Sequence, residues 1–207
     1  ETSGIGTTLA PEHHEPSLGK LRSCGQKYTG VDIKIVDENG NEVPTGEVGE
    51  ITIKSTIIMK GYWNRDEANN ESIVDGWFHT GDAGYFDDED FLYIYDRVKD
   101  MIISGGENIY PAEVENALMS HPDIIDAAAV GVPDDKWGET VKGFVILKEG
   151  AELTEQDIID STKEKIASYK CPTSINFIQE MPRNPSGKIL RRELREPYWD
   201  DKGRNVS

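Results

Sequence analysis

The stretch YDRVKDMIISGGENIYP, residues 95–111, marks the point at which the pattern of the chain changes. Upstream, residues 31–36 and 50–54 alternate apolar and polar side chains, which is typical of strands with one buried face. Downstream, apolar residues recur at helical spacing and alternate with short apolar runs. Charged residues near the start of the stretch interrupt an otherwise continuous hairpin. These features predict a hinge between a β-rich unit, residues 1–97, and a small α+β unit, residues 98–207.

The second unit is predicted to pack two helices on a three-stranded sheet. Pro111 suits the first turn of a helix, which Pro122 would end. Thr154 is a typical N-cap for a second helix, which we expect to continue as far as Pro172. The apolar runs between and after these helices predict strands at 124–132, 141–147 and 175–178.

The chain of 207 residues is strongly acidic, with 22 Lys and Arg against 39 Asp and Glu and a formal net charge of −17. Phosphate contacts need clustered cations, so this charge argues against a nucleic-acid partner and disfavours binding to anionic membrane surfaces. An anionic substrate is compatible with it, because a few lysines at one cleft can outweigh distant carboxylates.

Three features concern the cellular setting and the extent of the chain. The longest apolar runs fall far short of the ~20 residues that a membrane helix needs. Cys24 and Cys171 lie far apart without a pairing pattern, which favours a reducing, cytoplasmic location. The start, ETSG, has neither an initiator Met nor the features of a signal peptide, so we expect the chain to be part of a longer protein.

A first candidate site is GWFHTGD, residues 76–82, in which aromatic residues precede a Thr-Gly-Asp turn. A carboxylate held on a glycine turn, here that of Asp82, can accept two hydrogen bonds from the vicinal diol of a ribose. The alternative is an ordinary turn, since Asp is common in turns for local reasons.

A second candidate site is SGG, residues 104–106. Glycines have no side chain, so they suit a place where the backbone must approach another group closely. That partner is either another strand or a narrow ligand. The alternative for this segment is a bulged hairpin with an ordinary ion pair.

A third candidate site is PRNPSGK, residues 182–188, where Lys188 follows a Pro- and Gly-containing loop. A flexible ammonium on such a loop can deliver a point charge to phosphate or carboxylate oxygens. The spacing is not that of a Walker A loop. The alternative is a solvated surface lysine.

The sequence does not predict a structural metal site or a cysteine nucleophile. The acidic run at 87–90 is typical of a solvated turn, and the segment that begins at Asp37 lacks the glycine and the glutamate of a calcium loop. The histidines share no zinc-ligand spacing with the cysteines, and Cys24 has no nearby His.

Taken in order, these segments resemble the C-terminal part of the AMP-forming acyl-CoA synthetases, members of the adenylate-forming (ANL) superfamily, which includes firefly luciferase and nonribosomal adenylation domains. ETSG at 1–4 matches the tail of the family motif Tyr-Gly-x-Thr-Glu, GE at 49–50 and GYW at 61–63 match its middle strands, and the three candidate sites match its most diagnostic segments. The resemblance covers essentially the whole chain and is closest to bacterial medium- and long-chain fatty acyl-CoA ligases.

The resemblance implies an α+β fold and a two-step reaction. The fold would be the β-rich end of a large domain, a distorted β-barrel subdomain, followed by a mobile lid with a three-stranded sheet and flanking helices. In the reaction, a carboxylic acid and ATP give acyl-AMP and pyrophosphate, and the thiol of CoA then takes the acyl group and releases AMP. The implied ligands are the acid, ATP, Mg²⁺ and CoA.

The resemblance also implies roles for individual residues. Glu1 is expected to help hold Mg²⁺ on the phosphates, and Thr2 to contact the nucleotide. Asp82 is expected to accept hydrogen bonds from the ribose hydroxyls, and Arg97 to reach the same sugar or the phosphate. Lys188 would bridge the acyl carboxylate and the α-phosphate, where it stabilises the charge that builds in the adenylation transition state.

The expected lid turns about a hinge at Lys99 between the two steps. It would deliver Lys188 in one pose, and in the other it would present the residues that line the tunnel for the pantetheine arm of CoA, Ser104, Gly105 and Gly106. The segment YKCP, residues 169–172, also matches the family, where a structural role is expected.

Two alternatives stay open at this point. One is an adenylate-forming ligase with another acid or acceptor, such as a nonribosomal adenylation domain or a carrier-protein ligase. The other is a non-catalytic interaction module, against which the residue types at Asp82, Arg97, Lys99 and Lys188 speak. The family's phosphate-binding loop, adenine pocket and acyl tunnel belong upstream of Glu1, so the chain by itself is expected to be inactive.

Overall fold

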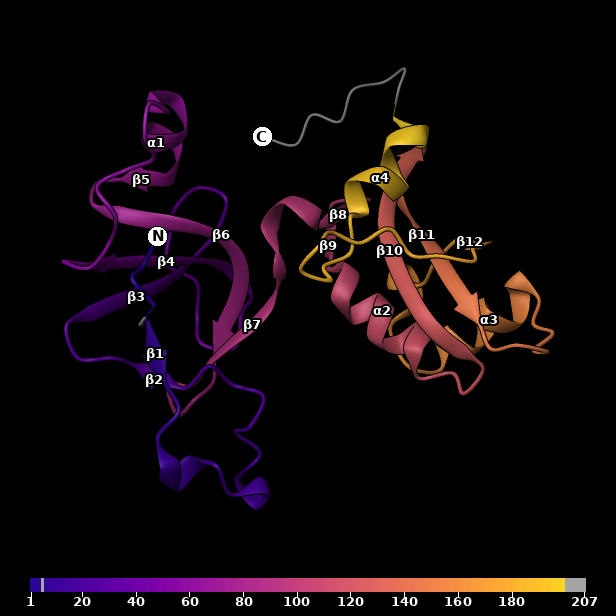
Figure 1. Cartoon of the computed structure of the whole chain (residues 1–207), viewed down its shortest axis with the longest axis horizontal. Helices are drawn as coiled ribbons and strands as arrows, with labels where there is room; N and C mark the ends of the chain where they lie inside the picture. Colours follow the sequence, from indigo (N-terminus) through magenta and orange to yellow (C-terminus); the bar gives the residue numbers. More distant parts are fainter. Residues whose placement is uncertain (5, 200–207) are drawn as a thin grey trace. The chain divides into compact units, whose positions relative to one another are not determined.

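The computed structural model describes residues 1–4 and 6–199, which divide into two compact units (Figure 1). Unit 1 is Glu1–Val98 and unit 2 is Lys99–Ser207, so the predicted hinge residue Lys99 is the first residue of unit 2. Residues 200–207, the end of the predicted lid, lie outside the described residues. Both units contain helices and sheets, which confirms the predicted α+β class. Of the described residues, none forms a helix long and apolar enough to span a membrane.

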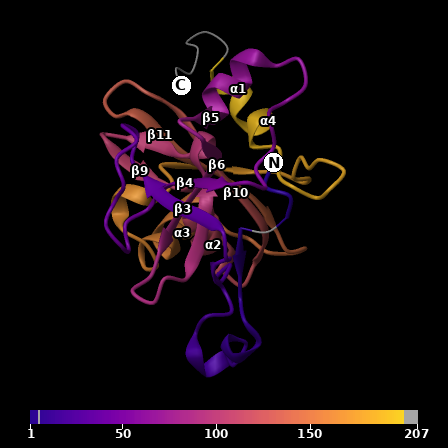
Figure 2. The same cartoon turned by 90° about the vertical axis from the view of Figure 1, so that its left-hand side faces the viewer.

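Unit 1 is built on a five-stranded antiparallel sheet. Its strand order is β3-β4-β6-β5, and β7 pairs with another stretch of β6. Strands β3 and β4 lie side by side in both views (Figures 1 and 2), with Ile33 opposite Ile53. Their alternating apolar residues form the core of the unit. The strands are β3 (Val31–Val36), β4 (Gly49–Ser55), β5 (Ile73–Val74), β6 (Trp77–Phe86) and β7 (Leu92–Arg97).

Smaller elements complete unit 1. A two-stranded sheet joins β1 (Thr7–Thr8) to β2 (Gln26–Lys27), and short 3₁₀ turns lie at Pro11–His13 and Pro16–Leu18. Helix α1 (Asp66–Ser72) precedes β5. The prediction of a distorted β-barrel is wrong for the described residues, because a barrel requires its first and last strands to pair and the sheet here is open at β3.

Unit 2 is built on a second five-stranded sheet, so the predicted number of three strands is wrong. The three predicted strands are present as β10 (Ile124–Asp134), β11 (Gly138–Leu147) and β12 (Ser174–Phe177), with β12 parallel to β11. The two additional strands, β8 (Ile102–Ser104) and β9 (Glu107–Ile109), form a short hairpin that meets β11 where Ser104 pairs with Gly138. Strands of this length are held by backbone hydrogen bonds and leave little side-chain pattern in the sequence.

Two of the helices in unit 2 begin where the sequence predicts. Helix α2 (Pro111–Met119) starts with a proline, and α3 (Glu155–Lys163) has a reciprocal capping box between Thr154 and Asp157. The expectation that the second helix continues to Pro172 is wrong. Helix α3 ends at Lys163, where the N–H groups of Lys165 and Ile166 both bond to the Thr162 carbonyl and the last turn tightens.

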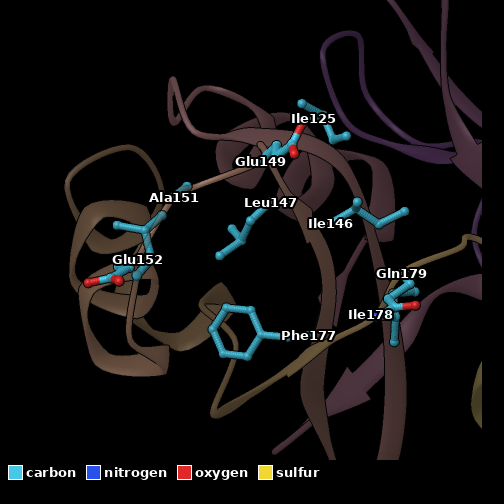
Figure 3. A pocket seen from close by; sticks show the side chains of 10 residues that line it. Ile125, Ile146, Leu147, Glu149, Ala151, Glu152, Phe177, Ile178 and Gln179 are labelled. Carbon is cyan, nitrogen blue, oxygen red and sulfur yellow. The ribbon is translucent and has the colours of Figure 1, made fainter.

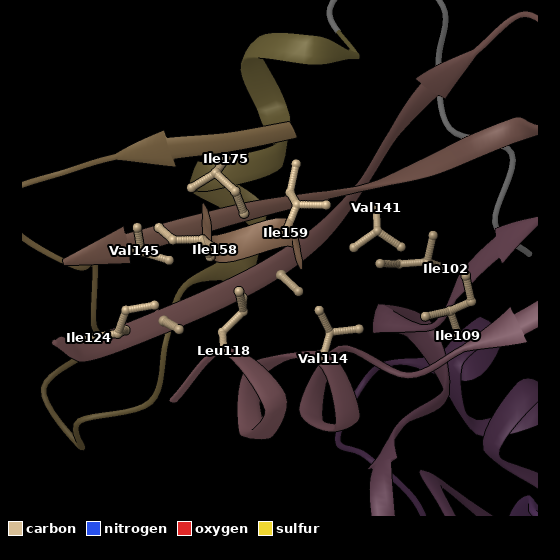
Figure 4. Close-up of a cluster of buried hydrophobic side chains, with 12 residues drawn as sticks. Ile102, Ile109, Val114, Leu118, Ile124, Val141, Val145, Ile158, Ile159 and Ile175 are labelled. Atoms are coloured by element: carbon tan, nitrogen blue, oxygen red, sulfur yellow. The ribbon is translucent and has the colours of Figure 1, made fainter. Parts of the chain in front are cut away.

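The sheet of unit 2 is covered on both faces, and this arrangement places the Lys188 segment. On one face, α2 and α3 enclose a cluster of aliphatic side chains that includes Val114, Leu118 and Ile158 (Figure 4). On the other face, Met181 and Leu194 pack against Val130 and its neighbours. The chain between these two anchors therefore runs across the sheet. The remaining short elements are α4 (Arg191–Arg195) and 3₁₀ turns at Val98–Asp100, Ser168–Lys170 and Glu196–Tyr198.

Candidate active site

Asp82 and the two residues before it lie within β6 rather than in a turn, at a bulge in the pairing of β4 with β6 that the carboxylate of Glu50 braces. One Glu50 oxygen accepts a hydrogen bond from the Gly81 N–H at 2.9 Å, and the other lies 2.7 Å from Nδ1 of His79. The Asp82 N–H donates to the Thr80 hydroxyl at 3.1 Å. Gly81 has a φ of +70°, a conformation that favours glycine. The backbone ahead of Asp82 is therefore fixed on both sides.

Asp82 and Arg97 form an ion pair on this braced surface. They are opposed in the β6–β7 pair, and Arg97 Nε lies 3.0 Å from Asp82 Oδ1. Their side chains are 33% and 46% exposed, so both are accessible to a ligand. An ionised carboxylate has about four acceptor positions, so the contact with Arg97 leaves Asp82 with capacity to bind hydroxyl groups.

Glu1 is hydrogen-bonded to Tyr62, and the charge of Arg97 affects the pKa of the Tyr62 hydroxyl. The Tyr62 hydroxyl donates to Glu1 Oε1 at 3.1 Å, and the Glu1 carbonyl accepts from the N–H of Met59. Burial and the Glu1 carboxylate raise the pKa of the Tyr62 hydroxyl, whereas the positive charge of Arg97 acts in the opposite direction. Thr2 follows and is partly buried. Glu1 is thus held through both its side chain and its backbone by residues 59–62.

The residues of unit 1 fit a magnesium ion that is held mainly by a substrate. Among the described residues, no three His, Cys, Asp or Glu side chains gather in a way that could enclose a metal ion. Mg²⁺ commonly binds proteins through one or two carboxylates and takes its other ligands from substrate phosphates and water. The exposed Glu1 carboxylate suits a single contact of this kind.

In unit 2, Lys188 lies in a short loop that Asn184 organises. The Lys188 N–H donates to the side-chain oxygen of Asn184 at 2.9 Å, and the Asn184 N–H donates to the Lys188 carbonyl at 2.9 Å. An isolated bridge between Arg183 and Ile189 closes the loop. The side chain of Lys188 is exposed. The loop therefore fixes the backbone of Lys188 and leaves its ammonium accessible.

The Ser104–Gly106 segment forms the turn between β8 and β9. The Gly105 N–H donates to the Trp137 carbonyl at 2.8 Å, and Gly105 has a φ of +60°. A Cβ at Gly105 would lie 2.7 Å from Cε3 of Trp137, whereas one at Gly106 would meet no atom within 4 Å. Glycine at 105 is thus favoured by both conformation and space, and Trp137 packs against this turn.

Sequence reasoning missed the ionic cluster next to the predicted hinge. Arg191 donates to both carboxylate oxygens of Glu115, at 2.9 and 2.7 Å, and lies 3.5 Å from Asp100, which follows Lys99 directly. Glu115 also accepts from the N–H of Ala129 on β10. Arg191 and Glu115 are 76 residues apart, so no local pattern could reveal their contact.

The YKCP segment makes contacts of a structural kind. Lys170 Nζ lies 2.7 and 2.8 Å from the two carboxylate oxygens of Glu113 near the start of α2, with both side chains about four-fifths buried. Cys171 is buried, and this burial raises the pKa of its thiol. A protonated, buried thiol is a poor nucleophile.

A shallow apolar pocket of about 570 Å³ lies elsewhere on unit 2 (Figure 3). Ile125, Ile146 and Phe177 line it, with Glu149 and Glu152 among its polar members. None of the site residues predicted from the sequence lines this pocket. The pocket is therefore separate from the chemistry that those residues could perform.

Comparison with known proteins places the chain in a family of AMP-binding ligases. The model of the AMP-binding enzyme family matches residues 1–63, and that of the AMP-binding enzyme C-terminal domain matches residues 113–188. The fatty acid–[acyl-carrier-protein] ligase ScoC of Streptomyces coeruleorubidus is 44% identical over all 207 residues, which span 40% of that protein. The 2-succinylbenzoate–CoA ligase of Bacillus licheniformis is 46% identical over 194 residues, 94% of this chain and 39% of the ligase.

Comparison with solved structures gives the same result as the sequence comparisons. The o-succinylbenzoate CoA synthetase MenE of Bacillus subtilis, in complex with AMP, superposes with a TM-score of 0.82 at 42% identity, covering 94% of this chain and 39% of MenE. The same enzyme has been solved with ATP and a magnesium ion. The chain spans about two fifths of the length of these relatives. It belongs to the AMP-binding enzyme family, the adenylate-forming ligases of the ANL superfamily.

Proposed function

We propose that the protein carrying this chain activates a carboxylic acid with ATP and transfers the acyl group to the thiol of CoA. The observation that carries this proposal is the Asp82–Arg97 pair, held across β6 and β7 and braced by Glu50. It offers a carboxylate for the ribose hydroxyls and a cation for a phosphate, which are the two groups that a nucleotide presents. Family membership supports the same nucleotide chemistry.

In the first step, a carboxylate oxygen of the acid attacks the α-phosphorus of ATP, and the bond to the leaving pyrophosphate breaks. Lys188 would contact the acyl carboxylate and the α-phosphate and stabilise the charge that develops there. Asp82, Arg97 and Thr2 would hold the nucleotide. Glu1 would supply one ligand to Mg²⁺, which when bound neutralises charge on the phosphates.

In the second step, the thiol attacks the acyl carbonyl and AMP leaves. We propose that unit 2 is a lid and that Lys99 is its hinge. Rotation of unit 2 about this hinge would withdraw Lys188 after the first step and present the Ser104–Gly106 turn for the second. Gly106, where a Cβ would meet no atom within 4 Å, leaves its backbone bare, which suits a narrow pantetheine arm, whereas Trp137 fills the space beside Gly105. The two free cysteines and the net charge of −17 favour a cytoplasmic enzyme without a nucleic-acid partner.

The proposal also names a specific acid and a specific acceptor thiol. A fatty acid is the first candidate, and the name of ScoC supports it. ScoC also supports a second candidate acceptor, the phosphopantetheine thiol of a carrier protein. The succinylbenzoate ligases support an aromatic acid instead. The Ser104–Gly106 turn suits either thiol, because both acceptors present the same pantetheine arm.

Pyrophosphate release by the protein expressed from its complete coding sequence tests the proposal. Fatty acids of rising length and 2-succinylbenzoate are supplied with ATP, and the acceptor is none, CoA or a phosphopantetheinylated carrier protein. We expect thioester formation that requires a fatty acid, ATP and CoA. Thioester on the carrier alone would move the acceptor to the second candidate. The absence of acid-dependent pyrophosphate release would overturn the proposal.

A further inference from the structure

Arg183 connects the loop of Lys188 to the sheet of unit 2. Its Nη1 donates to the carbonyl of Gly187 at 2.7 Å. Its Nη2 lies 2.9 and 2.7 Å from the two carboxylate oxygens of Asp126, near the start of β10. Asp126 also accepts from the N–H of Ala127, which fixes the direction of its carboxylate. One guanidinium thus joins the residue before Lys188 to β10.

The two ends of the loop are held differently. Asn184 fixes the backbone N–H and carbonyl of Lys188, as described above, and also accepts from the N–H and hydroxyl of Ser186. These contacts lie within the loop and set its shape. Arg183 adds a polar contact from the loop to β10, beside the apolar packing of Ile189 against the cluster that includes Val130, so it helps to set where the loop stands on unit 2.

The position of the loop matters because of the chemistry assigned to Lys188. Its ammonium ends a flexible four-carbon stem, so the direction of the backbone decides which positions the charge can reach. Gly187, with a φ of +85°, lies directly before it and tolerates backbone rotation that other residues resist. Electrostatic stabilisation of a transition state requires a charge that is already in place. A hydrogen bond to the Gly187 carbonyl opposes that rotation.

We propose that Arg183 is a positioning residue for Lys188 and that Asp126 orients Arg183. The inference rests on the proposed role of Lys188 in adenylation. The side chains of Arg183 and Asp126 are 41% and 24% exposed, so water screens the ion pair and limits its contribution to stability, and its main consequence is the geometry that it gives the loop.

The test compares variants of the protein expressed from its complete coding sequence in the two half-reactions separately. The variants are Arg183→Gln, Asp126→Asn, the double variant, and Lys188→Ala as the reference for complete loss of the ammonium. Arg192→Gln is the matched control, because Arg192 lies in the same segment, is 82% exposed and pairs only loosely with Glu196 at 3.7 Å. Adenylation is followed as pyrophosphate release, and the second step as thioester formation from supplied acyl-adenylate and CoA.

We expect Arg183→Gln to lower kcat of adenylation about 10- to 100-fold, since misplacing a catalytic group by ~1 Å costs on that order. The KM for ATP and the second half-reaction should be unchanged. Asp126→Asn should have a smaller effect of the same kind, and the double variant should resemble Arg183→Gln, because both side chains act through one contact. Arg192→Gln should behave as the parent protein.

Hydrogen exchange supplies a readout that does not depend on activity. In Arg183→Gln, the amides of Gly187 and Lys188 should exchange faster than in the parent protein, whereas those of β10 should not change. If Arg183→Gln folds poorly by circular dichroism, Asp126→Asn, which preserves the shape of the side chain, decides the question by the same measurements.

Three outcomes would overturn the inference. Adenylation that survives Arg183→Gln while Lys188→Ala abolishes it would show that Lys188 needs no such support. Equal losses in both half-reactions would indicate general damage to unit 2. Adenylation that survives Lys188→Ala would instead remove the proposed role of Lys188, and the positioning role with it.

Discussion

Asp82 and Arg97 are directly opposed on two paired strands, with Arg97 Nε 3.0 Å from Asp82 Oδ1. An exposed pair of this kind contributes about 0–1 kcal/mol to stability. The surrounding structure nevertheless fixes it closely, because Glu50 holds the Gly81 N–H and the two partners are paired across β6 and β7. Residues on strands hold a site more accurately than residues on loops. The pair is therefore better explained by ligand binding than by folding.

Asp82→Asn should weaken the binding of ATP. The amide keeps the shape of the carboxylate but loses its charge, and a hydrogen bond to a charged group contributes about 1.5–3 kcal/mol. We expect the KM for ATP to rise about 10- to 100-fold in assays of pyrophosphate release. Asp90→Asn is the matched control, because Asp90 is an exposed turn residue with a φ of +62° that Asn tolerates. Equal KM values for the two variants would contradict a role of Asp82 in nucleotide binding.

Gly105→Ala should impair the second half-reaction more than Gly106→Ala. Both positions have positive φ, so the backbone cost of about 1–2 kcal/mol is shared. Only the new methyl group at 105 would collide with Trp137, at 2.7 Å. We expect thioester formation from supplied acyl-adenylate to fall about tenfold or more in Gly105→Ala relative to Gly106→Ala. The same loss in both variants would mean that the contact with Trp137 does not shape the path of the thiol.

Two adjacent arginines should differ sharply in their contribution to stability. Arg191 is 18% exposed and binds Glu115 through two hydrogen bonds, whereas Arg192 is 82% exposed. Removing Arg191 leaves the carboxylate of Glu115 without its cation. Arg191→Gln should therefore lower the free energy of unfolding of unit 2 by about 1.5–3 kcal/mol. Arg192→Gln should change it by less than about 0.5 kcal/mol. Denaturant unfolding measures both, and similar midpoints would refute the assignment.

Lys99→Pro should affect the two half-reactions unequally if Lys99 is the hinge. Proline fixes φ near −65° and removes a backbone donor, so it restricts rotation at this position. A lid held in the orientation needed for one half-reaction would support that half-reaction and slow the other. Lys99→Ala, which leaves the backbone free, should retain both activities. Separate assays of the two half-reactions give the answer, and equal losses in Lys99→Pro would argue against a hinge here.

Elements with local signals could be predicted from the sequence. The alternation at 31–36 gives β3 with its bounds unchanged, and the capping residue Thr154 gives the start of α3. In both cases the information lies within a few residues of the element. Motif resemblance supplied the adenylate-forming family, which the comparisons confirm.

The features that the sequence did not reveal depend on distant residues. Strands β8 and β9 have three residues each and are defined by the hairpin they form and by one contact with β11. The bond between Glu50 and Gly81 spans 31 residues, and that between Arg183 and Asp126 spans 57. A charged residue far from its partner looks like any solvated surface residue, so these supports of the candidate site become visible only once the chain is folded.

Whether the protein forms an acyl-adenylate with the help of Lys188 is tested by acid-dependent exchange of labelled pyrophosphate into ATP, measured with the protein expressed from its complete coding sequence and with its Lys188→Ala variant. We expect exchange that requires a carboxylic acid, proceeds without CoA and falls about 10²- to 10³-fold in the variant, as for the loss of one preorganised contact to developing charge. No exchange with any fatty or aromatic acid, or exchange undiminished in Lys188→Ala, would contradict it.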